Sequence, residues 1–415
     1  MEIIKCERPP KNYAVSKKMD IVVPEVPELV TKVLIPPTEP SFTDKIGWHP
    51  LNVPKQDRYL EIEVPPLRFE RNSSSTLTLD EEQIPDALPN VGVKEIVLAV
   101  NYQPEVMVSA MNQVEEEFKV KITFSIEPEP LGTGDFILIV AGPLSLARDV
   151  LGKGDEPFFV LNSDVICEFP FKYLLDFHKS HGAEGTLMTT PVEDPSKYGV
   201  VCLKAESTQI ERFVEKPQTW VGDQINAGIY IFNPAILKRI THERPMSIEK
   251  EVFPHMARAG QLHATPLEGF WADVGQPKDF LTGSALYLES LAKKSDSRLH
   301  KADYVSGNVL VDPTAKIGKG CKIGPNVVIG PNAVIGDGVR LKDAVIMGGA
   351  NIKDFAWINK SIIGWHSSVG RWTRIDEITV LGEDVHVKDE IFTNGATVLP
   401  HKSVGANIST PQIVM

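Results

Sequence analysis

A six-residue repeat near the end of the chain constrains the fold more than any other sequence feature. Aliphatic residues recur at every sixth position, and the register slips by one residue twice. The series is Ile317, Ile323, Ile329, Ile335, Leu341, then Ile346, Ile352, Ile358, then Ile363, Val369, Ile375, Leu381 and Val387. This period is typical of a parallel β-helix, in which the aliphatic residue fills the core and a following glycine suits the tight corner. We therefore expect a left-handed parallel β-helix of hexapeptide repeats over residues 305–410.

A β-helix of this kind is compatible with two functions. Hexapeptide acyltransferases share the fold and use a histidine, and this region contains His366, His386 and His401. A lone histidine is more often an ordinary surface residue than a catalytic one. Stacked coils leave faces suited to self-association, so we favour a role in forming a homo-oligomer.

The region from 86 to 300 has a different pattern, with apolar runs that alternate with amphipathic segments. The run Phe158–Leu161 is continuously apolar, which is typical of a strand buried on both faces of a parallel sheet. Asn162, Ser163 and Asp164 follow it, at the sheet edge where ligands bind in open α/β folds. The alternative is an ordinary strand followed by an Asx turn.

The neighbouring segments complete a Rossmann-like, mostly parallel sheet of βαβ units. The predicted strands are Glu95–Val100, Lys121–Glu127, Glu184–Thr190, Tyr198–Leu203 and Gly228–Phe232. The predicted helices are Pro104–Phe118, Pro143–Leu151, Phe169–Ser180, Pro234–Ile240, Ser247–Ala259 and Pro277–Lys294.

Residues 1–85 do not share this pattern. Of the chain's 32 prolines, 13 lie between Pro9 and Pro89, and Gly47 is the only glycine before residue 90. Proline restricts its own backbone and that of the preceding residue, which disfavours long helices and central strands. We expect this segment to be poorly ordered.

Charge and cysteine content narrow the functional classes. The net charge of −12 argues against a protein that binds duplex nucleic acid. Four scattered cysteines, Cys6, Cys167, Cys202 and Cys321, show neither metal-ligand spacing nor a disulfide framework. No apolar signal core or membrane-spanning run is present, so we expect a cytoplasmic protein that does not bind membranes.

Several stretches match, in order, the motifs of one enzyme family. They are VKEIVLAVNYQPEVM (Val93–Met107), EPLGT (Glu129–Thr133), FFVLNSDVICEFPF (Phe158–Phe171), PSKYGVV (Pro195–Val201), RFVEKP (Arg212–Pro217), INAGIYIFNP (Ile225–Pro234), SIEKEVFP (Ser247–Pro254) and EGFWADVGQPKDFL (Glu268–Leu281). With the hexapeptide domain, they make the chain from Val91 onward resemble the fungal-type mannose-1-phosphate guanylyltransferases (GDP-mannose pyrophosphorylases). These belong to the sugar-nucleotide nucleotidyltransferases.

The resemblance implies a reaction and a set of catalytic residues. Family members join mannose 1-phosphate to GMP taken from GTP, and they release pyrophosphate. Two anions meet at the α-phosphorus, so positioning and charge neutralisation carry the catalysis. Asp164 and Asp273 match the family's Mg²⁺ ligands, and Lys216 matches the lysine that holds the sugar phosphate. Outside this context, Lys216 would be an ordinary solvated lysine in a turn.

The resemblance also implies substrate-binding residues. Glu215 and Asn226 match residues that hydrogen-bond the sugar hydroxyls, and Gly199 matches a backbone contact. On the nucleotide side, the matching residues are Gly132 and Thr133, within Leu131–Thr133, and Asn162. A regulatory paralogue is a further partner that the resemblance suggests.

The chain departs from the family at two places. The family's first strand leads into a glycine-rich loop, L-x-G-G-x-G-T-R-L-x-P-L-T, which holds the triphosphate and the leaving pyrophosphate. No such loop occurs here, so we expect the sheet to lack its first strand and loop. In addition, residues 134–140 (GDFILIV) interrupt a stretch that the family reads as L-G-T-A-G-P. Losing one preorganised donor costs about 3–4 kcal/mol, so losing several predicts abolished turnover.

We hypothesise that both departures arise from mis-joined coding sequence, such as a retained intron or a wrong first exon. A transcript that joins Thr133 to Ala141 and encodes the loop would support this, and one that matches the chain throughout would refute it.

Three function classes follow. The first is the guanylyltransferase, or a nucleotidyltransferase for another pair of sugar 1-phosphate and nucleoside triphosphate. The second is a catalytically impaired or regulatory subunit that binds sugar nucleotides, which the missing loop favours. The third is an interaction protein built on the β-helix. Retention of Asp164, Lys216 and Asp273 favours the enzyme.

Overall fold

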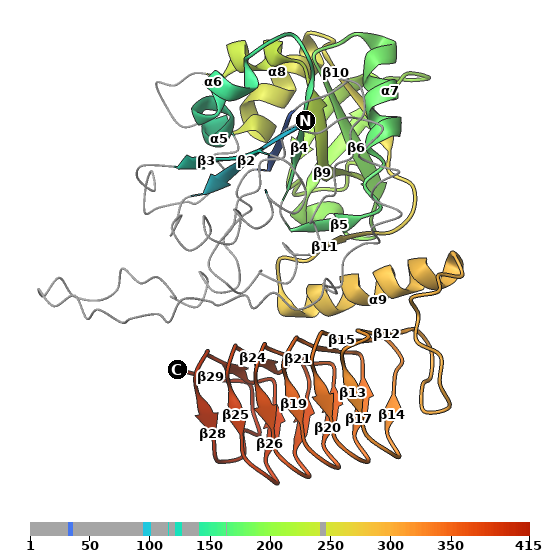
Figure 1. Cartoon of the computed structure of the whole chain (residues 1–415). Coiled ribbons are helices and arrows are strands. Elements are labelled where there is room, and N and C mark those ends of the chain that lie inside the picture. Colours follow the sequence, from blue (N-terminus) through green and yellow to red (C-terminus); the bar gives the residue numbers. More distant parts are fainter. Residues whose placement is uncertain are drawn as a thin grey trace, which may run out of the picture.

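The computed structural model describes residues 32–35, 94–100, 115, 121–126, 141–162, 164–240 and 246–415. Within these ranges the chain forms an α/β domain and a β-helix, and helix α9 (Pro277–Lys293) lies between them (Figure 1). The expected architecture, a mostly parallel sheet followed by a parallel β-helix, is confirmed.

The central sheet has the order β10-β6-β9-β4-β1-β2-β3. Its strands are β1 (Lys32–Ile35), β2 (Glu95–Val100), β3 (Lys121–Ile126), β4 (Phe158–Leu161), β6 (Gly185–Pro191), β9 (Gln224–Phe232) and β10 (Leu262–Pro266). Only β9 runs opposite to its neighbours in this order. A ribbon of β7 (Gly199–Leu203) and β8 (Ile210–Glu215) joins the sheet through β9. All four residues of β4 are buried, as its continuous apolar run predicts.

Strand β1 differs from expectation. We expected residues 1–85 to be poorly ordered and the sheet to lack its first strand. Instead, Lys32–Ile35 lies between β2 and β4 and pairs in parallel with both. Pro36 and Pro37 follow the strand directly, which agrees with proline's exclusion from the interior of a central strand. The first-strand position of the sheet is therefore filled, although the glycine-rich loop is absent from the sequence.

The described helical segments overlap the predicted helices, apart from one short turn at Pro195–Lys197 that was not predicted. They are α5 (Ala141–Leu146), α6 (Arg148–Leu151), α7 (Phe171–His181), α8 (Phe253–Arg258), α9, and the short turns η4 (Pro195–Lys197), η5 (Pro234–Arg239) and η6 (Ile248–Val252). The helix expected over Pro104–Phe118 lies outside the described residues except at Glu115.

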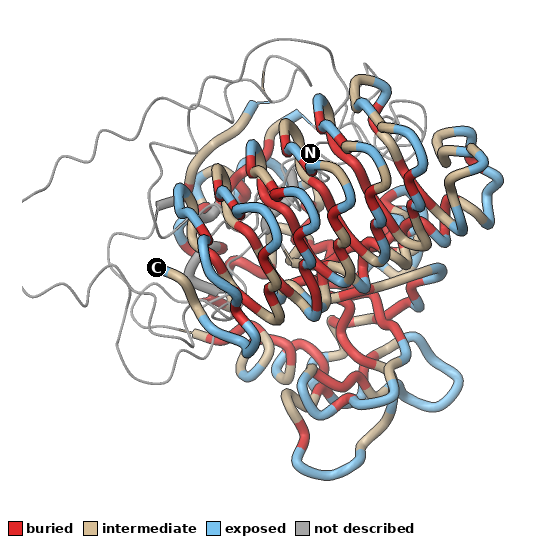
Figure 2. Tube along the Cα trace, turned by 90° about the horizontal axis from the view of Figure 1, so that it is seen from below, coloured by how far each residue is buried: buried red, intermediate tan, exposed pale blue. Residues whose placement is uncertain are grey.

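The β-helix has three parallel sheets, and each coil contributes one short strand to each sheet. Ile317 pairs with Ile335, eighteen residues on, whereas Ile329 pairs with Ile346, seventeen residues on. The shorter coil accounts for the first one-residue slip. The repeating aliphatic side chains form one buried core cluster inside the coils. Figure 2 shows that buried stretches recur from coil to coil along the β-helix.

The strands of each sheet are as follows. The first contains β12 (Val309–Val311), β15 (Val327–Ile329), β18 (Ala344–Ile346), β21 (Ile362–Ile363), β24 (Val380–Leu381), β27 (Thr397–Val398) and β29 (Ile413–Val414). The second contains β13 (Lys316–Ile317), β16 (Val334–Ile335), β19 (Asn351–Ile352), β22 (Ser368–Val369), β25 (His386–Val387) and β28 (Ser403–Val404). The third contains β14 (Lys322–Ile323), β17 (Arg340–Lys342), β20 (Trp357–Asn359), β23 (Arg374–Asp376) and β26 (Phe392–Asn394).

Helix α9 joins the two domains through a shared apolar cluster. Its Tyr287, Leu288 and Leu291 are buried in the same cluster as Ala272 and Val274 of the α/β domain. The β-helix contributes a row of outward-facing residues from its first sheet, namely Leu310, Val328, Val345 and Ile362. One face of the β-helix is therefore covered by α9 (Figure 1).

Among the helices that the structure describes, none combines the length and the apolar character that crossing a bilayer would require.

Candidate active site

The candidate site includes the carboxyl end of β4, where the sequence analysis expects a ligand to bind. Asn162 follows β4, and its backbone N–H donates to the carbonyl of Gly228 over 2.8 Å. Gly228 has a φ of +73°, and a Cβ there would lie 2.8 Å from Asn162 Nδ2. Because β9 runs antiparallel to β4, its first residues lie beside the end of β4. Asn162 is thus brought next to the start of β9.

Asp164 and Asp273 lie side by side, although 109 positions separate them in the sequence. Strand β5 (Val165–Cys167) pairs antiparallel with β11 (Trp271–Asp273), with Asp273 opposite Val165. A Cβ placed on Gly275 would lie 3.2 Å from Asp273 Oδ1 and 3.3 Å from Asp164 Oδ2. Burial and the nearby Asp279 raise the pKa of Asp273, opposed by a hydrogen bond from Gly275 and by Lys216. Two adjacent, partly buried carboxyl groups form an acidic site suited to a cation.

Lys216 lies in the turn after β8 with a φ of +46°, and its backbone N–H donates to Tyr198 over 3.0 Å. Its Nζ is 3.9 Å from Glu215 Oε1. Burial lowers the pKa of Lys216, whereas the charges of Glu249 and Asp273 act to raise it. The ammonium group is therefore close enough to Asp273 and Glu249 to interact with them electrostatically.

Gly199 and Glu215 are paired residues of the β7–β8 ribbon. A Cβ on Gly199 would lie 2.4 Å from Phe213 Cζ and 2.8 Å from Glu215 Oε2, so a larger residue would displace both side chains. Glu215 Oε2 is buried and has no hydrogen-bond partner among the described residues. A buried carboxylate oxygen without a partner is costly unless a ligand supplies one.

Asn226 lies on β9 and connects to two residues that we did not assign from the sequence. Its Nδ2 donates to Tyr230 Oη over 2.6 Å and to Glu249 Oε1 over 3.2 Å, and its Oδ1 accepts from the Gly228 N–H over 3.1 Å. Glu249 lies in the matched stretch SIEKEVFP, but nothing in that stretch shows which of its charged residues faces the site.

The structure thus gathers most of the predicted site residues around one region. Asn162, Asp164, Gly199, Glu215, Lys216, Asn226 and Asp273 are linked by the pairings, hydrogen bonds and charge interactions above. Gly132 and Thr133 lie outside the described residues, as does Ser163. The described part of the chain contains no group of three or more histidine, cysteine, aspartate or glutamate residues arranged for a metal ion. The ammonium group of Lys216 could bind a phosphate, and the side-chain oxygens of Glu215 and Asn226 could accept hydrogen bonds from hydroxyl groups.

Family models match two regions of the chain. Residues 82–290 match a model described as nucleotidyl transferase, and residues 305–414 match one described as the GMPPB C-terminal domain. The two matches together cover the α/β domain and the β-helix.

Curated relatives match over most of their length. A mannose-1-phosphate guanyltransferase from Emericella nidulans is 59% identical over 334 residues, which is 80% of this chain and 90% of the relative. Mannose-1-phosphate guanylyltransferase 1 from Arabidopsis thaliana is 56% identical over 331 residues, again 80% and 90%. The mannose-1-phosphate guanyltransferase from Schizosaccharomyces pombe is 58% identical over 332 residues, 80% of this chain and 89% of the relative.

Proposed function

Because this chain belongs to the mannose-1-phosphate guanyltransferase family, we propose that it makes GDP-mannose and pyrophosphate from GTP and mannose 1-phosphate. The observation that carries this proposal is the placement of Lys216 beside Asp273 and Glu215, in one site at the sheet edge. The proposed place of action is the cytoplasm.

The proposed reaction is a single displacement at phosphorus. A phosphate oxygen of mannose 1-phosphate attacks the α-phosphorus of GTP, and the bond to the β-phosphate oxygen breaks, so that pyrophosphate leaves. Lys216 holds the sugar phosphate as a point charge, which offsets the repulsion between the two anions. Glu215 and Asn226 accept from the sugar hydroxyls and fix the sugar, while Gly199 leaves room for Glu215. Gly132, Thr133 and Asn162 are proposed contacts of the nucleotide.

Asp164 and Asp273 are the proposed ligands of Mg²⁺. Their adjacent carboxyl groups fit a hard cation that prefers one or two carboxylates, phosphate oxygens and water. The raised pKa of Asp273 shows that burial disfavours its charge, which a bound cation would compensate. When bound, Mg²⁺ neutralises charge on the phosphates.

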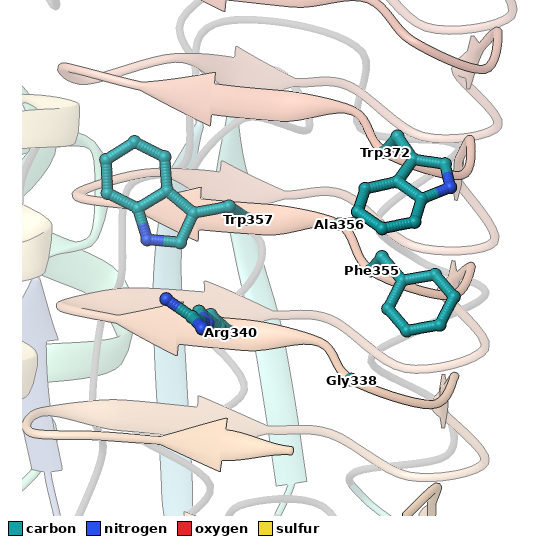
Figure 3. Close-up of a pocket in the computed structure, with 6 residues that line it drawn as sticks. All are labelled: Gly338, Arg340, Phe355, Ala356, Trp357 and Trp372. Carbon is teal, nitrogen blue, oxygen red and sulfur yellow. The ribbon is translucent and has the colours of Figure 1, made fainter. Parts of the chain in front are cut away.

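We further propose that the β-helix forms a homo-oligomer, with a regulatory paralogue as a second partner. The third sheet and the turns that lead into its strands carry aromatic and arginine side chains (Figure 3). Phe355 and Trp372 stack at 4.4 Å and are 46% and 63% exposed. Arg374 lies 4.0 Å from the ring centre of Trp357. Tryptophan and arginine are the residues most enriched in interface hot spots, which supports a second copy of this chain as the partner.

The reaction is tested by pyrophosphate release from the purified full-length chain with Mg²⁺, GTP and mannose 1-phosphate. We expect release that falls by about a hundredfold or more in Asp273→Asn, because the acidic pair is broken. Glu206→Gln, an exposed carboxylate away from the site, is the matched control and should keep the full rate. Glucose 1-phosphate, or another nucleoside triphosphate, tests the choice of substrate pair.

Calorimetry with mannose 1-phosphate tests whether the sugar-binding part of the site is intact, independently of whether the chain catalyses the reaction. This matters because the sequence lacks the glycine-rich loop of the pyrophosphate side. Binding without pyrophosphate release, from a folded chain, would contradict the catalytic proposal and favour a regulatory subunit.

A further inference from the structure

The hydrogen bonds of Asn226 restrict what its amide can offer a ligand. Both hydrogens of Nδ2 have partners within the protein, one at Tyr230 Oη and one at Glu249 Oε1. The Oδ1 atom accepts from the Gly228 N–H and retains a second lone pair. In this arrangement Asn226 can form a hydrogen bond with a sugar hydroxyl only as the acceptor, through Oδ1.

Glu249 is a partly buried residue of the same cluster. It belongs to η6, which Ser247 caps by accepting from the Lys250 N–H over 3.1 Å. The charges of Glu215 and Lys216 both act on it, so it shares the site with the groups proposed to bind the sugar phosphate. Its Oε1 accepts a hydrogen bond from Asn226 Nδ2.

We propose that Glu249 is a positioning residue for sugar recognition, holding the Asn226 amide so that Asn226 Oδ1 and Glu215 Oε2 are presented together as acceptors to the sugar hydroxyls. This inference rests on the proposed function and adds a residue that determines which sugar 1-phosphate is bound. A sugar ring brings several O–H donors, and Glu215 Oε2 is a buried acceptor that lacks a protein donor. Without Glu249 the amide could rotate and present its NH₂ group instead.

The charge balance around Glu249 agrees with this role. Burial and the neighbouring Glu215 raise the pKa of Glu249, while Lys216, the Asn226 hydrogen bond and Lys250 oppose the rise. A carboxyl group that keeps its proton adds no negative charge to a site that must admit a phosphate dianion. Its remaining carbonyl oxygen still accepts from Asn226. Glutamine is neutral and has the same shape. Glu249→Gln should therefore preserve sugar-phosphate binding.

The experiment measures binding of mannose 1-phosphate and of glucose 1-phosphate to the full-length chain with Mg²⁺ by calorimetry. We expect Glu249→Met to weaken mannose 1-phosphate binding by roughly tenfold or more and to reduce the preference between the two sugars. Glu249→Gln should bind within about threefold of the wild type, because it keeps the acceptor. GTP binding should be unchanged in both variants, since a general loss of structure would lower it as well.

Glu251→Gln is the matched control. It lies on the same short helix, but its carboxylate accepts from the backbone N–H of Ser247 rather than from Asn226. This variant should bind both sugar phosphates as the wild type does. Should Glu249→Met fail to fold, Glu249→Asp takes its place, because it keeps the polar group but withdraws it from Asn226.

Two results would overturn the inference while leaving the proposed function intact. One is wild-type affinity and sugar preference in Glu249→Met or Glu249→Asp. The other is a loss in Glu249→Gln as large as that in Glu249→Met. If the folded wild-type chain binds no mannose 1-phosphate, the proposed function fails and this inference fails with it.

Discussion

At the scale of single residues, a buried histidine makes the stability of the α/β domain depend on pH. His178 is 2% exposed, and its ring nitrogens lie 2.8 Å from Thr186 Oγ1 and 3.2 Å from Asn233 Oδ1. Burial, helped by the charge of His263, lowers its pKa to about 4, compared with about 6.5 in the unfolded chain. Between these two values the unfolded state binds a proton that the folded state does not. Stability should therefore fall as the pH drops from about 6.5 towards about 4.

Within that pH range, His178 should lower the free energy of unfolding by about 1.4 kcal/mol for each unit by which the pH falls. Urea unfolding at a series of pH values would measure it, with His178→Gln expected to show a shallower loss. His255→Gln, a change at an exposed histidine, is the control and should follow the wild-type curve. Identical pH profiles for all three proteins would contradict the prediction.

The candidate site shows which residues a sequence can assign and which it cannot. Asp164, Lys216 and Asp273 are in motifs, and the structure places them around one sheet edge, although their roles stay predictions. Glu249 also lies in a matched motif, but a charged residue in a short helix gives no sign of which way it faces. Its proximity to the candidate site is visible only in the folded structure, through the hydrogen bond from Asn226, across 23 positions, and the charges of Glu215 and Lys216.

At the scale of elements, the hexad positions of the β-helix should carry most of its stability. Ile358 is fully buried in β20, with coils on both sides. Ile358→Ala should cost about 2–5 kcal/mol, because it removes buried methyl groups and leaves a cavity. Val334→Ala, an outward-facing position that is 40% exposed, should cost less than about 1 kcal/mol. Urea unfolding of the two variants would test this, and equal losses would show that the hexads do not form the core.

An element could be predicted when the pattern that defines it lies within its own stretch of sequence. The hexads repeat a local pattern, so the β-helix and its slips could be predicted from Ile317 onward. Strand β1 is only Lys32–Ile35, and its place in the sheet comes from pairing with β2 and β4, far along the chain. A short run of three apolar residues after Lys32 and before two prolines does not reveal such partners. Composition therefore missed the strand within residues 1–85.

At the scale of the whole molecule, the three sheets of the β-helix meet different surroundings. The outward residues of its first sheet, such as Val328 and Val345, are buried beneath α9, which also packs on the strand that ends at Asp273. The turns before β20 and β23 instead present the exposed Phe355 and Trp372, and β23 presents the exposed Arg374 over Trp357. The face that positions the catalytic domain is thus distinct from the face proposed for self-association, so an oligomer can form without displacing α9.

This separation predicts that oligomerisation can be weakened without unfolding the chain. Trp372→Ala combined with Phe355→Ala should shift the full-length protein to smaller species in sedimentation velocity, because the exposed aromatic stack is removed. Its thermal unfolding should stay close to that of the wild type. Trp220→Ala removes another exposed tryptophan, 70% accessible on the α/β domain, and should leave the sedimentation coefficient unchanged. A wild-type chain that sediments as a monomer, or a double variant that keeps the wild-type size, would show that this face is not the interface.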